Sequence, residues 1–110
     1  MVIRLLALTA ILAGAAAPHT ALAQELGDAG KGLTYASQVC AQCHALRRGD
    51  LYSPMPKAPA FEEIANTSGV TGISLAASLH SVHENMPNFV LSEGDRDNII
   101  AYILSLKRPG

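Results

Sequence analysis

Apolar residues recur every three or four positions in three separate stretches of the chain, at residues 28–43, 72–81 and 92–108. This spacing places the apolar side chains on one face of a helix, so each stretch is predicted to form an amphipathic α-helix. A shorter helix of about one turn is predicted at residues 61–65. No stretch shows the alternation that is typical of a half-buried strand. The predicted fold class is therefore all-α, with long loops between the helices.

The last of these helices has the clearest boundaries. Ser92 is a suitable N-cap, and Asp95 follows three residues later in the position of a capping-box acid. Acidic residues continue through the first turn, whereas Lys107 and Arg108 stand at the end. The charge at each end therefore has the sign that interacts favourably with the helix dipole. Pro109 is expected to end the helix.

The N-terminal residues have the pattern of an export signal. Arg4 precedes a stretch rich in apolar residues at 5–17, and Ala21-Leu22-Ala23 is typical of a signal cleavage site. Pro18 interrupts the stretch before it reaches the roughly 20 apolar residues that a membrane-spanning helix needs. We expect cleavage after Ala23, and an uncleaved membrane anchor is the alternative.

Cleavage there divides the chain into a signal peptide, residues 1–23, and one domain, residues 24–110. The domain keeps seven of the eight basic side chains and all nine acidic ones, because only Arg4 is lost. This balance excludes the basic surface that nucleic-acid binding requires. The chain has no tryptophan and two phenylalanines. A domain of this size with so small a core often depends on a disulfide, a metal or another covalent support.

The pentapeptide Cys40-Ala41-Gln42-Cys43-His44 lies at the end of the first predicted helix. Two thiols three residues apart on a helical turn point in the same direction, so each can add to one vinyl group of the same porphyrin. His44 is then carried beneath the porphyrin plane, where its imidazole can bind iron. This spacing is that of a c-type haem attachment site, and covalent attachment outside the cytoplasm agrees with the predicted export. The sequence therefore predicts one covalent haem c.

Three other interpretations of Cys40 and Cys43 are less favourable. Exported proteins often contain disulfides, but a disulfide between cysteines on neighbouring turns closes a very short loop and constrains little. A thioredoxin-like redox pair is expected in a βαβ context, which the pattern does not predict. A zinc site needs four ligands of suitable geometry, and His80 and His83 do not match the spacing of the cysteines.

Met86 is the preferred candidate for the second axial ligand of the iron. It lies in a loop directly before a proline, and a thioether ligand raises the reduction potential relative to a second histidine. Met55 is less favourable because it follows His44 by only 11 residues, too few to reach the opposite face of a porphyrin easily. His80 and His83 remain alternatives, and either would give a bis-histidine haem of lower potential.

These residues and their order resemble the class I cytochrome c family over about residues 28–106. The matching segments are, in chain order, Cys40-Ala41-Gln42-Cys43-His44, Pro59-Ala60-Phe61, Met86-Pro87-Asn88-Phe89 and Ile99-Ile100-Ala101-Tyr102-Ile103-Leu104-Ser105-Leu106. The resemblance implies a class I cytochrome c-like fold. In that fold the first and last helices cross around one covalently bound haem, whose iron is held by His44 and Met86.

The resemblance also implies two particular contacts. The first and last helices are expected to meet where Gly32 faces Ile99 and Tyr102, because a glycine permits close approach. The backbone carbonyl of Pro59 is expected to accept a hydrogen bond from the ring nitrogen of His44 that does not bind iron. Such a bond fixes the orientation of the imidazole.

The predicted function is that of a soluble periplasmic one-electron carrier, not an enzyme, because iron with both axial positions filled has no site for a substrate. The expected partners are redox proteins that bind weakly, with no nucleic acid, no stable membrane insertion and a monomeric state. Arg47 and Arg48 are candidates for the docking rim. Two alternatives remain open: a haem-based sensor or small peroxidase in which the bond to Met86 is labile, and an electron-entry subunit of a larger dehydrogenase or oxidase.

Overall fold

A computed structural model describes residues 27–81 and 86–110 of the chain. The helices are α1 (Ala29–Val39), α2 (Phe61–Asn66), α3 (Gly72–His80) and α4 (Glu93–Ser105). All regular secondary structure in these two described segments is helical, so the all-α prediction is confirmed for them. The predicted signal peptide, residues 1–23, lies outside the described residues. No helix in the described part of the chain has the length and hydropathy needed to cross a bilayer.

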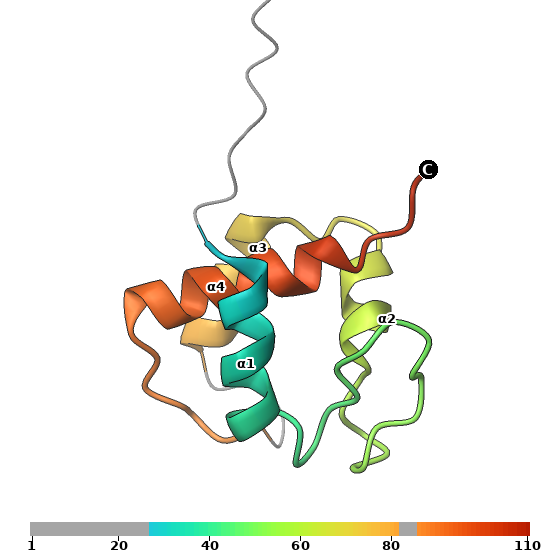
Figure 1. Ribbon diagram of the computed structural model, residues 1–110, viewed down its shortest axis with the longest axis horizontal. Coiled ribbons are helices and arrows are strands. Elements are labelled where there is room, and N and C mark those ends of the chain that lie inside the picture. Colours follow the sequence, from blue (N-terminus) through green and yellow to red (C-terminus); the bar gives the residue numbers. More distant parts are fainter. Residues whose placement is uncertain (1–26, 82–85) are drawn as a thin grey trace, which may run out of the picture.

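The last helix is the centre of the fold (Figure 1). The backbones of α1, α2 and α3 each approach α4 closely, whereas within the described residues these three helices do not approach one another. The buried side chains of α4 therefore form the middle of the core, and the other elements pack around them. The core cluster consists of Ala36, Leu46, Phe61, Ala65, Leu75, Ile99, Ile100, Tyr102, Ile103 and Leu106.

The structure corrects the end of the first helix. The prediction extended it to Cys43, but α1 ends at Val39 and Cys40 is its C-cap. The carbonyl of Ala36 accepts hydrogen bonds from the backbone N–H of Cys40 (2.8 Å) and of Ala41 (3.0 Å). The bond to Ala41 spans five residues instead of four, so the regular α-helical pattern stops there. The cysteines consequently lie on a turn that follows the helix.

The start of α4 is as predicted, but its end is not. Ser92 is the N-cap, and its hydroxyl accepts a hydrogen bond from the backbone N–H of Asp95 (3.1 Å). The same hydroxyl donates to the Asp95 carboxylate (2.6 Å). Lys107 and Arg108 lie beyond the last residue of the helix, and the ammonium of Lys107 donates to the carbonyl of Val70 (2.7 Å). The basic residues at the end of this stretch therefore bind other segments.

α1 and α4 cross at Gly32, as the resemblance implied. A β-carbon at this position would overlap the backbone carbonyl of Asn98 and lie 2.9 Å from the β-carbon of Tyr102. The side-chain oxygen of Asn98 also accepts a hydrogen bond from the backbone N–H of Asp28 (2.8 Å). The expected contact with Tyr102 is present, but the nearest group is Asn98 instead of Ile99.

Replacing Gly32 by alanine is expected to destabilise the folded protein by about 2 kcal/mol. A helical alanine is favoured over glycine by about 1 kcal/mol, but forcing extra volume into a closely packed contact costs typically 1–3 kcal/mol or more. The colliding group here is a backbone carbonyl, which cannot rotate away. Urea unfolding of the haem-loaded protein would measure the loss.

Gly94→Ala is the matched control for this experiment. Gly94 also lies in a helix, α4, but a β-carbon there would have no heavy atom within 4 Å. The control is expected to gain about 0.5–1 kcal/mol from helix propensity alone. If Gly32→Ala is as stable as Gly94→Ala, the proposed close crossing is wrong.

Candidate functional site

The two cysteines and the histidine lie together on the turn that follows α1. The backbone N–H groups of Cys43 and His44 both donate to the carbonyl of Cys40, at 3.1 and 2.9 Å. Both cysteines are half-buried and their thiols are free. One short hydrogen-bonded turn therefore presents two sulfur atoms and an imidazole.

Burial, and secondly the negative charge of Cys43, raise the pKa of Cys40 from 9.0 to about 11. The Cys40 thiol consequently keeps its proton at neutral pH. A thioredoxin-like redox pair works in the opposite way, because its attacking cysteine has a lowered pKa. Together with the helical surroundings, this shift argues against the redox-pair interpretation.

His44 is oriented by the chain that follows it. Its Nδ1 lies 2.7 Å from the backbone oxygen of Pro59, which is the contact that the resemblance implied. A carbonyl oxygen only accepts hydrogen bonds, so Nδ1 must carry the proton and donate it. In a neutral imidazole this leaves the lone pair of Nε2 available to a metal. The Phe61 ring packs beside the imidazole, with ring centroids 5.4 Å apart and a tilt of 50°.

Residues 45–60, which we call the proximal loop, form an ordered unit. The backbone N–H of Phe61 donates to the carbonyl of Ala45 (2.9 Å) and closes the base of the loop. Inside it, the N–H of Ala45 donates to the Ser53 hydroxyl (3.0 Å), and the N–H of Met55 donates to the carbonyl of Cys43 (3.2 Å). The backbone of Met55 is therefore held next to residues 40–44, which we call the attachment turn.

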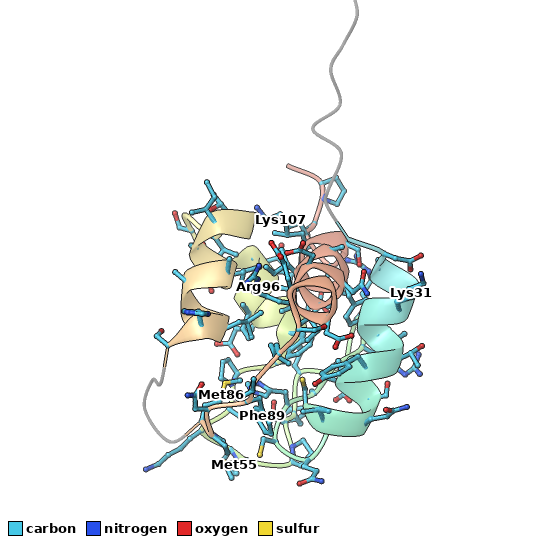
Figure 2. All side chains as sticks on the ribbon, turned by 90° about the vertical axis from the view of Figure 1, so that its left-hand side faces the viewer. Lys31, Met55, Met86, Phe89, Arg96 and Lys107 are labelled. Carbon is cyan, nitrogen blue, oxygen red and sulfur yellow. The ribbon has the colours of Figure 1, made fainter. Side chains whose placement is uncertain are left out.

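Met86 begins the second described segment, in the loop that leads to α4. It is half-buried, and Figure 2 shows it near Phe89 and Met55 at one end of the molecule, with Lys107 at the other end. His80, the alternative ligand, is exposed at the last residue of α3. His83, the other alternative, lies outside the described residues.

Large apolar side chains on both loops remain uncovered. Tyr52 and Leu51 on the proximal loop are 92% and 54% exposed, and Val90 and Phe89 after Met86 are 97% and 39% exposed. A planar apolar group between these loops would cover part of this surface. Together with two thiols, an imidazole nitrogen and a thioether, the residues present fit a covalently bound haem.

The structure also shows a buried carboxylate that the sequence pattern did not reveal. Glu62 in α2 is only 6% exposed. One of its oxygens accepts from the backbone N–H of Gly49 (2.6 Å), and the other from the Nε of Arg108 (3.3 Å). The hydrogen bond from Gly49 lowers the pKa of Glu62, burial opposes the change, and the charges of Arg108 and Arg48 lower it further.

Arg48 has a structural contact that the sequence analysis did not anticipate. Its guanidinium donates to the carbonyls of Ser105 (2.8 Å) and Leu106 (3.3 Å) at the end of α4. A cation at a helix C-terminus satisfies carbonyls that lack helical partners. Arg48 therefore joins the start of the proximal loop to the end of α4, although it is an exposed residue, as is Arg47.

The stability of the folded protein is expected to fall in acid because of Glu62. Its folded pKa lies below the ordinary value of 4.5, so the unfolded chain binds this proton more tightly. The stabilisation is fully present above the unfolded pKa and is lost as the pH falls through the folded pKa. Thermal unfolding between about pH 7 and pH 3 should show a smaller acid loss in Glu62→Gln than in the unmodified protein. Parallel curves would contradict the expectation.

Comparison with known proteins gives one relative. The chain is 35% identical over 97 residues to cytochrome c-552 of Bradyrhizobium diazoefficiens, and the match covers 88% of this chain and 89% of the relative. No protein-family model and no solved structure matches the chain. The match spans nearly the whole length of both proteins, so it includes the turn that carries Cys40, Cys43 and His44.

Proposed function

The chain belongs to the small mono-haem c-type cytochromes, and we propose that it carries single electrons through one haem c attached to Cys40 and Cys43, with His44 and Met86 as the axial ligands. The observation that carries this proposal is the orientation of His44. Its Nδ1 contacts the Pro59 carbonyl, so in a neutral imidazole Nε2 keeps a lone pair, on the same turn as two free thiols.

A bound haem supplies one-electron exchange between Fe(III) and Fe(II). The residues of the chain set the conditions for that exchange. The Pro59 carbonyl fixes the imidazole and increases its basicity, while the soft thioether of Met86 favours the reduced iron. Phe61 packs against the imidazole and also against Tyr102, with the Phe61 and Tyr102 ring centroids 6.4 Å apart. These rings form an apolar surface beside the imidazole.

Filled axial positions make electron transfer the natural activity and leave no position for a substrate. The protein is therefore an electron carrier rather than an enzyme. Its expected partners are redox proteins that bind through small transient contacts, and we expect neither nucleic acid nor stable membrane insertion. The signal pattern of residues 1–23 supports export to the periplasm, where the mature domain would act as a soluble monomer.

The decisive experiment determines the mass and the potential of the protein purified from the periplasm. After denaturation and acid extraction, the polypeptide should retain the mass of one haem, and a variant with both Cys40 and Cys43 changed to serine should not. A potentiometric titration with visible spectra should then show one centre with His/Met ligation. A colourless extracted polypeptide would contradict the proposal.

Carbon monoxide distinguishes the carrier from the sensor or peroxidase alternative. The reduced carrier should bind it slowly or incompletely at neutral pH, because Met86 occupies the sixth position. Prompt stoichiometric binding would show a labile Met86 and favour the alternative. Recovery of the native protein only in a stable complex would instead favour an electron-entry subunit.

A further inference from the structure

We propose that Glu62 is a positioning residue for His44, acting through the proximal loop; this inference rests on the proposed function. The carboxylate touches neither the imidazole nor the attachment turn. It binds the start of the loop at Gly49 and the C-terminal segment at Arg108. Through these contacts it sets where the loop ends, at the carbonyl of Pro59 that accepts the hydrogen bond from His44 Nδ1.

The first step of the argument is the turn at the start of the loop. The backbone N–H of Asp50 donates to the carbonyl of Arg47 (3.1 Å), and Gly49 within this turn has a φ of +83°. That conformation is accessible to glycine at little cost, and it is accompanied by the short hydrogen bond from Gly49 to Glu62. Arg48, from the same turn, binds the end of α4. The turn is thus bound to α2 through Gly49 and to the end of α4 through Arg48.

The second step is the weakness of α2 on its own. The helix has six residues and no side-chain hydrogen bond at its N-cap, and helices this short are not stable in isolation. Contacts with distant segments must therefore fix the position of its first turn. Glu62 supplies one of these contacts, and Asn66 supplies another by donating to the carbonyl of Leu106 (3.2 Å).

The third step connects the first turn of α2 to the imidazole. Pro59 lies two residues before α2 begins. Two hydrogen bonds connect the start of the proximal loop to the first turn of α2. One is the backbone hydrogen bond from Phe61 to Ala45, and the other is the hydrogen bond from the backbone of Gly49 to the side chain of Glu62. A substitution at Glu62 removes the bond to Gly49. The bond between Phe61 and Ala45 joins two backbone groups and remains. When the bond to Gly49 is lost, the loop opens more easily, and the 2.7 Å contact between His44 and Pro59 opens with it.

The groups that face the Glu62 carboxylate favour its ionised form. They are the backbone N–H of Gly49, the guanidinium of Arg108 and, at longer range, the guanidinium of Arg48. The neighbouring carboxylate of Glu63 belongs to an exposed residue. A buried carboxylate that accepts charge-assisted hydrogen bonds holds its partners more strongly than a neutral side chain does. This environment suits a residue that fixes a loop.

The test measures solvent exchange of the His44 Nδ1 proton by NMR in the reduced haem protein. Glu62→Ala should increase the exchange rate by about tenfold or more, since loss of a charged hydrogen bond makes opening easier. Glu62→Gln keeps an oxygen for Gly49 but loses the charge, so its rate should lie between those of the alanine variant and the unmodified protein. Glu63→Gln removes the same charge from the adjacent exposed position, and its rate should be unchanged.

Ser92→Ala controls for a general loss of stability. It removes the N-cap of α4 and lowers the stability of the protein without changing the proximal loop. When both variants are compared at the same distance from their unfolding midpoints, Ser92→Ala should not increase the exchange rate of the His44 Nδ1 proton as Glu62→Ala does. If the alanine variant at Glu62 does not fold, the glutamine variant replaces it, with an expected increase of about threefold. Equal rates in that variant and the unmodified protein would overturn the inference.

The outcomes separate this inference from the proposed function. A normal His/Met spectrum with unchanged Nδ1–H exchange in Glu62→Ala overturns the positioning role and leaves the electron carrier intact. An effect of Glu63→Gln as large as that of Glu62→Ala also overturns it, because charge alone would then explain the change. A purified protein without covalent haem overturns the proposed function, and this inference with it.

Discussion

Replacing His44 by alanine is expected to reduce the yield of haem-loaded protein by at least about tenfold. The imidazole is the proposed iron ligand, and the Pro59 carbonyl holds it in place through Nδ1, which leaves Nε2 for the metal. Its loss would remove the proposed axial ligand and one of the rings that pack against Phe61. Because metal binding and folding are coupled, a chain that cannot hold iron loses stability as well. Covalent haem per polypeptide, measured from the visible spectrum after purification, reports the effect.

His80→Ala is the control for this prediction. His80 is exposed at the end of α3, and its removal should leave haem content and spectrum unchanged. A normal yield of low-spin protein from His44→Ala would show that another residue binds the iron. A loss of haem in His80→Ala would favour the bis-histidine alternative instead.

Replacing Met86 by alanine is expected to lower the reduction potential by on the order of 100 mV. The thioether favours Fe(II) over Fe(III), and a one-electron couple shifts by about 59 mV for each tenfold change in that preference. The variant should also bind carbon monoxide or imidazole rapidly, because the sixth position is then open. Potentiometric titration measures the first effect, and ligand-binding spectra measure the second.

Met55→Ala is the matched control, since Met55 is also followed by a proline and lies at the same end of the molecule (Figure 2). Its backbone is bound to Cys43 on the histidine side of the site, and it should contribute no ligand. If the potential changes in Met55→Ala and not in Met86→Ala, the two roles are reversed. An unchanged potential in both variants would direct attention to His80 and His83.

The hydrogen bonds around Glu62 connect the proximal loop, which contacts His44 through Pro59, to the end of the chain. Glu62, Asn66 and Arg48 connect α2 and the turn at Gly49 to the end of α4. The hydroxyl of Tyr102 adds a buried bond to the carbonyl of Leu46 (2.7 Å). The C-terminal helix therefore contacts the proximal loop as well as the core.

The sequence alone predicted the features that depend on short-range spacing. The pentapeptide from Cys40 to His44 brings two thiols and an imidazole together because they are neighbours on one turn. The four helices follow from the period of the apolar positions, and the Ser92 cap follows from residue type and position. In each case the interacting atoms are a few residues apart, so covalent geometry and the helical period nearly fix their arrangement.

Only the tertiary structure decided which polar groups meet across long separations. Glu62 and Arg108 are 46 residues apart, and Arg48 and Leu106 are 58 residues apart. The sequence pattern had placed Arg108 at the end of the last helix and Arg48 on a docking rim, and it gave no role to Glu62. The partner of a polar side chain depends on where the folded backbone carries it, and no period along the chain encodes that position. The same reason explains why Gly32 was expected against Ile99 but is closest to the carbonyl of Asn98.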